Sequence, residues 1–308
     1  MKTLTIVASF ILITLNLSAQ SSATLKYQLE KGKTYRLKSE SVQEQKTTMN
    51  GMENSTQIEN TVYLSLKALG SKPDFFMGEI HFDTIINKTS TPQMVISSAS
   101  EGNIGSSDVV EVMTCVLHRL SQSTILAKMS YTGHVIDIMN YDLIRQTLMA
   151  GTDSLQGMAA MAKPQIEMMS EKAALMSMIE SVTAILPNSE VKVKETWVSQ
   201  FESKTGGFGM LIKSTVKLND IKNNTAFATS DILIETVAGK PMVANGAEIT
   251  GELRGIGSAE MEIDITTGWT QKNVSSMQIA GDMHVSASGQ NFTIPMEIHS
   301  NTTVTVIE

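Results

Sequence analysis

The sequence contains few cysteine, proline and aromatic residues. Cys115 is the only cysteine, there are six prolines, and aromatic residues make up 5% of the 308 residues. One cysteine excludes an internal disulfide framework, so stability must come from the burial of apolar side chains. Trp197 and Trp269 each open a predicted strand, but so few aromatic residues give little support for a carbohydrate-binding platform.

Positive charge and long apolar runs are scarce as well. Lysine and arginine total 24 against 31 aspartates and glutamates, which gives a net charge of −7. This net acidity disfavours nucleic acid and anionic membranes as partners. After residue 20, no run approaches the ~20 apolar residues that a membrane-spanning helix requires. We therefore expect no membrane span in the remaining chain.

The first 20 residues have the features of a secretory signal peptide. Lys2 provides a positive start, residues 4–17 form a short apolar stretch, and small residues lead up to Ala19 and Gln20. No cysteine follows to carry a lipid anchor. The sequence therefore predicts a protein that is exported after cleavage near Ala19 or Gln20, to the periplasm or the extracellular space.

Hydrophobic periodicity divides the remaining chain into three regions of one predicted α+β domain, residues 21–308. Period-two patterns predict strands over 24–99, period-3.6 patterns predict helices over 108–186, and long strands are predicted over 190–307. In the first region, Asn50-Gly51 lies between predicted strands 34–47 and 56–68 and indicates a hairpin. A third strand, 75–87, alternates Ile80, Phe82 and Thr84 with polar residues.

The middle region predicts helices with one short hairpin between them. Ser107 is expected to cap a helix that reaches Leu120, and Asn140 is expected to cap residues 141–149. Two short strands, 124–130 and 134–139, lie between these helices. A longer helical stretch follows from Ser154 to Leu186, where Pro187 marks its end.

The last region predicts a meander of antiparallel strands separated by turn residues. Alternation is clearest where Met261, Ile263 and Ile265 face away from the intervening acids. Sheets this long twist and curl. The helices lack another apolar partner, so the predicted fold is a large curled antiparallel sheet with helices packed on its concave face. The predicted strands are 190–204, 208–221, 225–237, 248–266, 269–286 and 290–307.

Three short motifs resemble an uncharacterised family of secreted proteins of Gram-negative bacteria, classed as a domain of unknown function. They are Tyr131-Thr132-Gly133-His134-Val135, Leu186-Pro187 followed by Val191 and Thr196-Trp197, and Asp264-Ile265-Thr266-Thr267-Gly268. Where the family has Gly-Asp before the tryptophan, this chain has Lys194-Glu195. The resemblance implies no known activity. By shape, the expected fold also resembles that of periplasmic lipoprotein carriers, which is an analogy of fold alone.

Methionines concentrate in the predicted helix 154–186. On a continuous helix five of them fall within roughly a 100° arc, flanked by Leu175 and Ile179, with polar residues opposite. Methionine fills irregular cores and forms adaptable apolar surfaces, whereas a thioether site for Cu(I) would usually have a second ligand type nearby. The candidate ligand-binding residues are Leu175, Ile179 and the methionines of the arc: Met158, Met161, Met168, Met169 and Met176.

Other patterns give weaker support for chemistry. Glu79, His81 and Asp83 alternate along one strand face, as do Glu260, Glu262 and Asp264, but a solvated strand face has the same pattern. Ser189-x-x-Lys192 and Lys204-Thr205-Gly206 match β-lactamase-like motifs, but they lie too close together and in predicted strands. Cys115 falls on the apolar side of its helix, as expected of a small buried filler. We expect no catalytic residues, no metal and no cofactor.

The sequence therefore favours a non-enzymatic binding protein. A curled sheet beneath methionine-bearing helices would enclose a site for a lipid, an acyl chain or a hydrophobic peptide. The alternative is a structural or protein-interaction module that binds an exported protein partner and whose filled core leaves no cavity. A cavity of several hundred Å³ between helices and sheet would distinguish the two.

Overall fold

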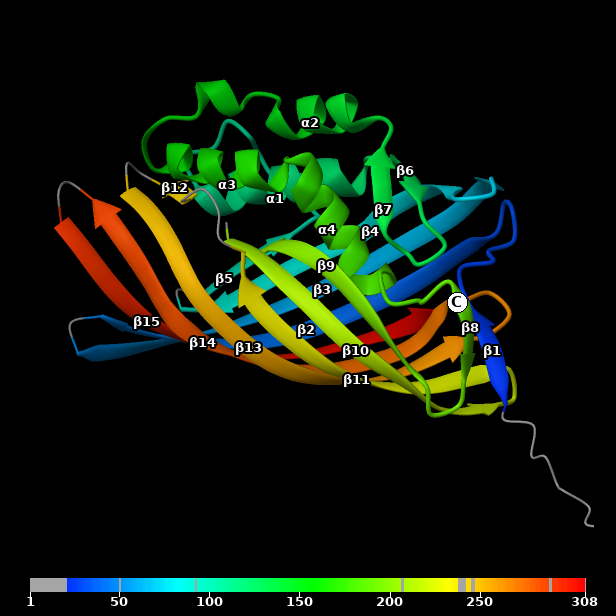
Figure 1. The fold of residues 1–308 in the computed structure, drawn as a ribbon. Coiled ribbons are helices and arrows are strands. Elements are labelled where there is room, and N and C mark those ends of the chain that lie inside the picture. The colour runs from blue at the N-terminus through cyan, green and yellow to red at the C-terminus, as the bar shows by residue number, and fades with distance from the viewer. Residues whose placement is uncertain are drawn as a thin grey trace, which may run out of the picture.

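The computed structural model describes residues 21–307 except 50, 92, 206–207, 238–241, 245–246 and 288–289. The predicted signal peptide, residues 1–20, lies outside the described residues. Figure 1 shows one long, bent sheet with the helices gathered on one side of it. None of the helices in the described ranges is both long and apolar enough to cross a membrane.

Thirteen of the described strands form one antiparallel sheet, and β1 (Ser22–Leu25) pairs with β8 (Ser189–Lys192) in a separate two-stranded sheet. The strands of the large sheet follow the order β7-β6-β4-β3-β2-β15-β14-β13-β11-β10-β9, so its path is open and ends at β7 and β9. The short strands β5 and β12 pair with β4 and β13 respectively. The bounds of the large-sheet strands are β2 Thr34–Met49, β3 Met52–Ser71, β4 Phe76–Ser90, β5 Gln93–Ser97, β6 Ile125–Met129, β7 Val135–Ile138, β9 Thr196–Thr205, β10 Phe208–Lys222, β11 Thr225–Thr236, β12 Met242–Ala244, β13 Ala247–Asp264, β14 Thr270–Ala287 and β15 Gln290–Ile307.

The first two helices begin close to the predicted positions, but their caps differ. α1 (Val109–Ser121) is capped by Asp108, whose carboxylate accepts the Val110 N–H; the predicted cap was Ser107. Asn140 does precede α2 (Tyr141–Met149), but its side chain makes no cap bond there. Its amide instead accepts from Leu126 N and donates to Thr124 O, so it fixes the start of β6.

The prediction of one continuous helix over 154–186 is wrong. This stretch contains the 3₁₀ helices η1 (Thr152–Ser154) and η2 (Gly157–Ala162), followed by α3 (Lys163–Met169) and α4 (Lys172–Thr183). Pro164 lies in the first turn of α3, where proline starts a helix because its missing N–H is not needed. Ser170 then ends α3, because its hydroxyl bonds back to Glu167 O.

The predicted strand 190–204 is also two strands, in different sheets. β8 and β9 are separated by a turn in which Lys194 has φ +77°, in the left-handed region. Lys194 N donates to Leu218 O and Leu218 N donates to Glu195 O, which fixes the turn against β10. The tight turn therefore forms although the chain has lysine where the resembling family has glycine.

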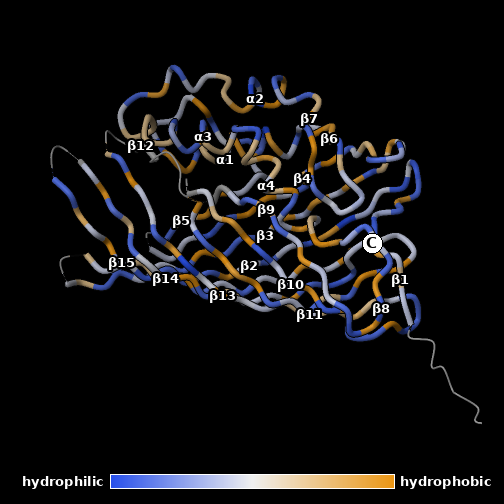
Figure 2. Tube along the Cα trace, viewed as in Figure 1, coloured by the Kyte–Doolittle hydropathy of each residue, from blue (hydrophilic) through white to orange (hydrophobic). Residues whose placement is uncertain are grey.

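The main apolar core lies between the helices and one face of the large sheet. Leu66, Ile80 and Phe82 of the sheet and Leu120 and Leu175 of the helices are all buried in it. We call this core the first apolar cluster, and we call the face of the sheet that packs on it the helix-side face. A bulge in β4 shifts the alternation, so that Ile85 and not Thr84 faces the core after Phe82. Figure 2 shows hydrophobic and hydrophilic residues alternating along the strands.

Helix α4 connects the two ends of the open sheet. It packs on β9 and also contacts β7. At β7, Glu180 Oε1 accepts the Val135 N–H at 2.8 Å, and Thr183 Oγ1 donates to Gly133 O just before the strand. At β9, Trp197 Nε1 donates to Ile185 O, directly after the helix. The helix and the residues after it thus bridge the two edge strands.

Candidate functional site

Charged side chains are segregated to one face of the sheet. Successive residues of a strand point to opposite faces, and residues paired across strands share a face. The register therefore assigns each residue to the helix-side face, which carries Leu37 and Leu64, or to the opposite, outer face. Among the described residues of β2, β3, β10, β11, β13, β14 and β15, no aspartate, glutamate, lysine or arginine occupies the helix-side face.

A second apolar cluster lies on this uncharged face, separate from the first. Its buried members come from β10, β11, β13 and β15, and its half-buried members come mainly from β14. One row of paired residues, Ile212, Ile234, Gly255, Ile279 and Ile298, crosses five strands. The cluster consists of Met210, Ile232, Ile234, Leu253, Ala259 and Met296, with Ile212, Met277, Ile279, Met283 and Ile298 packed against them.

Glycine on β13 shapes the surface of the second cluster. A Cβ atom on Gly255 would lie 2.7 Å from Ile279 Cγ1, and one on Gly257 would lie 2.8 Å from Met277 Cγ. The side chains of β14 therefore lie over the glycines of β13. Larger residues at these glycines would displace Ile279 and Met277.

The main contacts of the helices with the sheet lie away from the second cluster. Their main contacts with the sheet are made by α1 on β4 and β5 and by α4 on β7 and β9. Five members of the cluster are consequently only half-buried, whereas Leu66, Ile80 and Ile125 in the first cluster are fully buried. The second cluster is therefore an apolar surface that remains partly exposed.

The structure separates the predicted ligand-binding residues. Met158 and Met161 lie on η2 with 71% and 58% of their surface exposed, so the prediction that they face inward is wrong. Leu175 and Ile179 are fully buried in the first cluster. Because the predicted helix is broken into short pieces, its methionines do not form one stripe. Of the remaining three, Met169 and Met176 are half-buried and pack against the first cluster, and Met168 is half-buried.

The methionines of the second cluster were not among the binding residues predicted from the sequence. Met277, Ile279, Gly281 and Met283 occupy every second position along β14, with Gln278, Ala280 and Asp282 between them, and this period-two pattern is visible in the sequence. It was overlooked because methionine density is higher around residues 158–178. The period-two placement of apolar residues and glycine was the signal that could have identified this surface.

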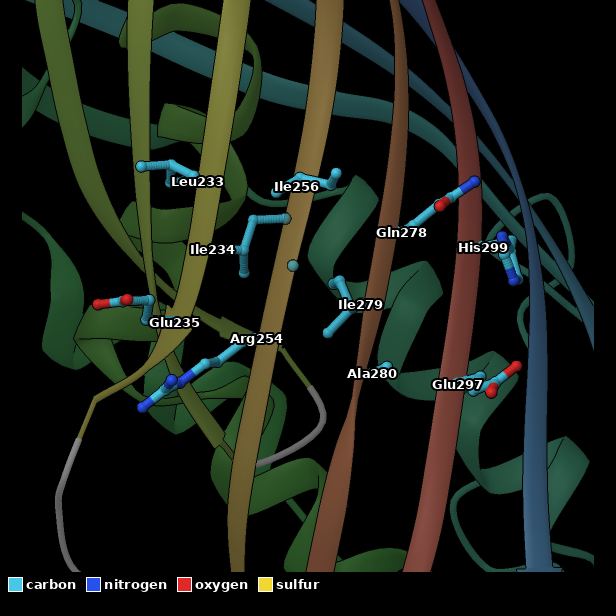
Figure 3. A pocket seen from close by; sticks show the side chains of 11 residues that line it. Leu233, Ile234, Glu235, Arg254, Ile256, Gln278, Ile279, Ala280, Glu297 and His299 are labelled. Carbon is cyan, nitrogen blue, oxygen red and sulfur yellow. The ribbon is translucent and has the colours of Figure 1, made fainter.

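A pocket of about 560 Å³ is lined mostly by residues of the outer face, and also by Ile234, Gly255 and Ile279 from the row that crosses the second cluster. Its residues come from β11, β13, β14 and β15, and Figure 3 shows them on neighbouring strands with the helices beyond the sheet. Its walls include the exposed Leu233 and Ile256 and the polar residues Arg254, Gln278 and His299. No helix residue lines it. It therefore does not represent the expected space between helices and sheet.

The residues considered for metal binding are not assembled into a site. His81 Nε2 lies 3.5 Å from Glu79 Oε1, while Asp83 accepts a hydrogen bond from Ser65. Within the ranges that the structure describes, no group of three histidine, cysteine, aspartate or glutamate residues is placed to hold a metal ion. The row of Glu260, Glu262 and Asp264 lies on the outer face.

The remaining candidates occupy structural positions. Trp197 and Trp269 are 9% and 3% exposed, so neither forms a sugar platform. Ser189 and Lys192 lie on β8 and not on a helix, and Gly206 lies outside the described residues. Cys115 is half-buried on α1.

Comparisons with solved structures give distant likenesses. The chain is 10% identical to lipovitellin, in a structure of its lipid–protein interactions, with a TM-score of 0.42; the match covers 91% of this chain and only 25% of lipovitellin. An outer membrane channel from Pseudomonas putida F1 is 6% identical over 92% of this chain and 98% of its own, with a TM-score of 0.24. At these scores neither likeness says what this protein binds.

Sequence comparisons identify the family. No curated protein matches the sequence significantly. Residues 77–270, which include α1 to α4 and the strands from β4 to β13, match a family described as a family of unknown function, DUF6263. The match covers more than half of the chain, and the protein therefore belongs to the DUF6263 family.

Proposed function

We propose that this protein is an exported, non-enzymatic binder of apolar molecules, and that the ligand lies against the second apolar cluster. One observation carries the proposal: a methionine- and isoleucine-rich surface on an uncharged sheet face, half-buried and outside the main helix contacts. Flexible, polarizable methionine side chains suit a surface that adapts to varied apolar ligands.

The arrangement of helices and sheet supports an enclosed site. In this proposal the sheet curls around its helix-side face, so that the helices lie on the concave side. α4 joins the two edge strands through Glu180 and the residues after Thr183. The second cluster would then form the open end of a trough whose other end is filled by the first cluster. A ligand would enter at the end where Met283 and the exposed Met49 and Met52 lie.

The absence of catalysis is part of the proposal. A general acid or base must lie within hydrogen-bonding reach of the substrate. The helix-side face of the strands that carry the second cluster has no carboxylate, lysine or arginine among its described residues. A molecule bound there would meet apolar groups, hydroxyls and amides, which hold a ligand without transferring protons at neutral pH.

A structural or protein-interaction role is the alternative. The first cluster favours it, because Leu175, Ile179 and Ile166 are completely buried and leave the helix-covered end filled. In that case the second cluster would be covered by another protein instead of a small apolar ligand.

Titration with an apolar fluorescent probe distinguishes these roles. We expect saturable binding of 1-N-phenylnaphthylamine by the full chain. Met277→Gln and Met283→Gln place a polar amide on the second cluster, and each should weaken binding about fivefold, since roughly 1 kcal/mol of apolar contact is lost. Ser276→Gln is the matched control, because Ser276 is exposed on the outer face beside Met277. No saturable binding by the parent, or equal effects of all three changes, would refute the proposal.

Export is tested in the producing cell. The proposal predicts a soluble mature protein in the periplasm or outside the cell, lacking the first 19 or 20 residues. Intact-mass measurement of the protein from each cell fraction checks this. A mass that retains Met1, or recovery with the cytoplasm, would contradict it.

A further inference from the structure

Two unpaired amides border the second apolar cluster. Gln43 and Gln45 lie on β2, on the helix-side face, and are paired across the sheet with Ser300 and Ile298. Both are half-buried. Among the described residues, neither amide has a hydrogen-bond partner, whereas the nearby Asn87 amide already donates to Asn60. Gln43 and Gln45 therefore present free donors and acceptors beside an apolar surface.

The row that contains Gln45 gives the site its length. From Gln45 it runs through Ile298, Ile279 and Gly255 to Ile234. The row crosses four strand spacings of about 4.8 Å, so the amide and the far end of the apolar strip are about 19 Å apart. This shape fits a single extended chain with a polar group at one end better than it fits a compact ring system.

The absence of charge limits the nature of that polar group. A carboxylate, phosphate or ammonium group moved from water to this face would find no opposite charge among the described residues that the seven strands place there, and burying an unpaired charge is costly. The charged residues of α4 that approach β7 are already engaged: Lys172 pairs with Asp137, and Glu180 bonds Val135 N and lies 3.5 Å from His134. An amide, in contrast, both donates to and accepts from hydroxyl, ester and amide groups.

We propose that the ligand is a neutral amphiphile with one long hydrocarbon chain. The chain lies along the second apolar cluster, and an uncharged hydroxyl, ester or amide head group hydrogen-bonds to Gln43 and Gln45. This inference rests on the proposed function and specifies the class of molecule bound at the same surface. It assigns to Gln43 and Gln45 the contact with the uncharged head group, and to the uncharged face the selection against charged lipids.

Displacement of 1-N-phenylnaphthylamine provides the test. Three competitors with the same chain, 1-monomyristoylglycerol, myristate and tetradecylamine, are compared at pH 8 below the concentrations at which each aggregates. The neutral glyceride should displace the probe at a concentration at least about tenfold lower than either charged competitor requires. The expected preference follows from the cost of an unpaired buried charge.

Variants locate the head-group contact. Gln43→Leu/Gln45→Leu should weaken binding of the glyceride about three- to tenfold relative to binding of the probe, the effect of losing one hydrogen bond. Gln57→Leu is the control, because Gln57 is exposed on the outer face of β3. Circular dichroism and thermal melts establish that both variants fold like the parent.

The outcomes separate this inference from the proposed function. If the probe binds but all three competitors displace it equally, or if the double variant binds the glyceride as tightly as the parent does, the inference is overturned and the apolar binder stands. If neither probe nor competitor binds, both fail. A concentration-dependent dimer that excludes the probe would show that a second copy covers the cluster, which also overturns the inference.

Discussion

The two apolar clusters on the helix-side face differ in what covers them. In the first, sheet residues such as Phe82 meet α1 and α4 and are excluded from water. In the second, Ile279 and Met283 remain half-buried on an equally uncharged face. The same strand pattern thus supports a filled core at one end of the sheet and a partly exposed apolar surface at the other. The position of the helices, and not the strand pattern, determines which end of the sheet is covered.

Truncating one large residue in each cluster should give the largest contrast. Phe82→Ala removes a fully buried ring and should lower the free energy of unfolding by about 3–5 kcal/mol. Ile279→Ala should cost less than about 2 kcal/mol, because its side chain is only partly removed from water in the parent. Denaturant melts measure both. Equal losses would mean that the second cluster is packed as tightly as the first.

Removing the contact of α4 with β7 should have the next largest effect. Glu180→Ala leaves the N–H of the buried Val135 without its partner, which should cost about 1–3 kcal/mol. Glu167→Ala on the exposed side of α3 is the control and should change stability by less than about 0.5 kcal/mol. If both variants have the same stability as the parent in thermal or denaturant melts, α4 does not hold the edge of the sheet.

Alkaline pH should lower the free energy of unfolding through a tyrosine of the first apolar cluster. Burial raises the pKa of Tyr27, whose hydroxyl donates to Thr183 O beside the end of α4. Because the folded-state pKa is above the unfolded value of about 10, this contribution is complete below pH 10 and is lost as pH rises further. The slope should be at most about 1.4 kcal/mol per pH unit. Tyr27→Phe should abolish this part of the dependence between pH 10 and 11.5.

The smallest expected effect is at the turn that leads into the covered edge strand. Lys194 adopts a left-handed conformation that glycine accepts without strain, so Lys194→Gly should raise stability by about 0.5–1 kcal/mol. Lys192→Gly, in the neighbouring extended strand, should instead lower it. A loss at Lys194 would indicate that its side chain contributes more than its backbone conformation costs.

The strands could be predicted from the sequence better than the helices. Long period-two patterns separated by glycine and asparagine placed β10, β11, β13, β14 and β15 within a few residues, because each strand repeats the same local signal, whereas the short β12 was not predicted. The segment 154–186 failed because its apolar spacing fits a helix, whereas Pro164 and Ser170 divide it into pieces. At residues 190–204 the pattern continues across a turn formed by a lysine, so the periodicity concealed the break.

The candidate site could not be predicted because it depends on pairing across strands. The high density of methionine predicted a binding site that includes Met158 and Met161, but both side chains are exposed. The second cluster combines Met210, Ile234, Met277 and Met296 from four strands, and only the register shows that they share a face. The uncharged character of that face is likewise invisible until each residue is assigned to one side of the sheet.

The segregation of charge also bears on how the sheet reaches its correct alignment. A slip of one residue in any strand moves its whole outward set of side chains to the opposite face. For β13 such a slip would carry Glu252, Arg254 and Glu260 onto the apolar clusters. Misaligned strands would therefore bury several unpaired charges at once and would dissociate before neighbouring strands could add to them. The charges on the outer face thus disfavour misaligned strand pairing during folding. Without them, the repetitive patterns of these strands would allow many alignments.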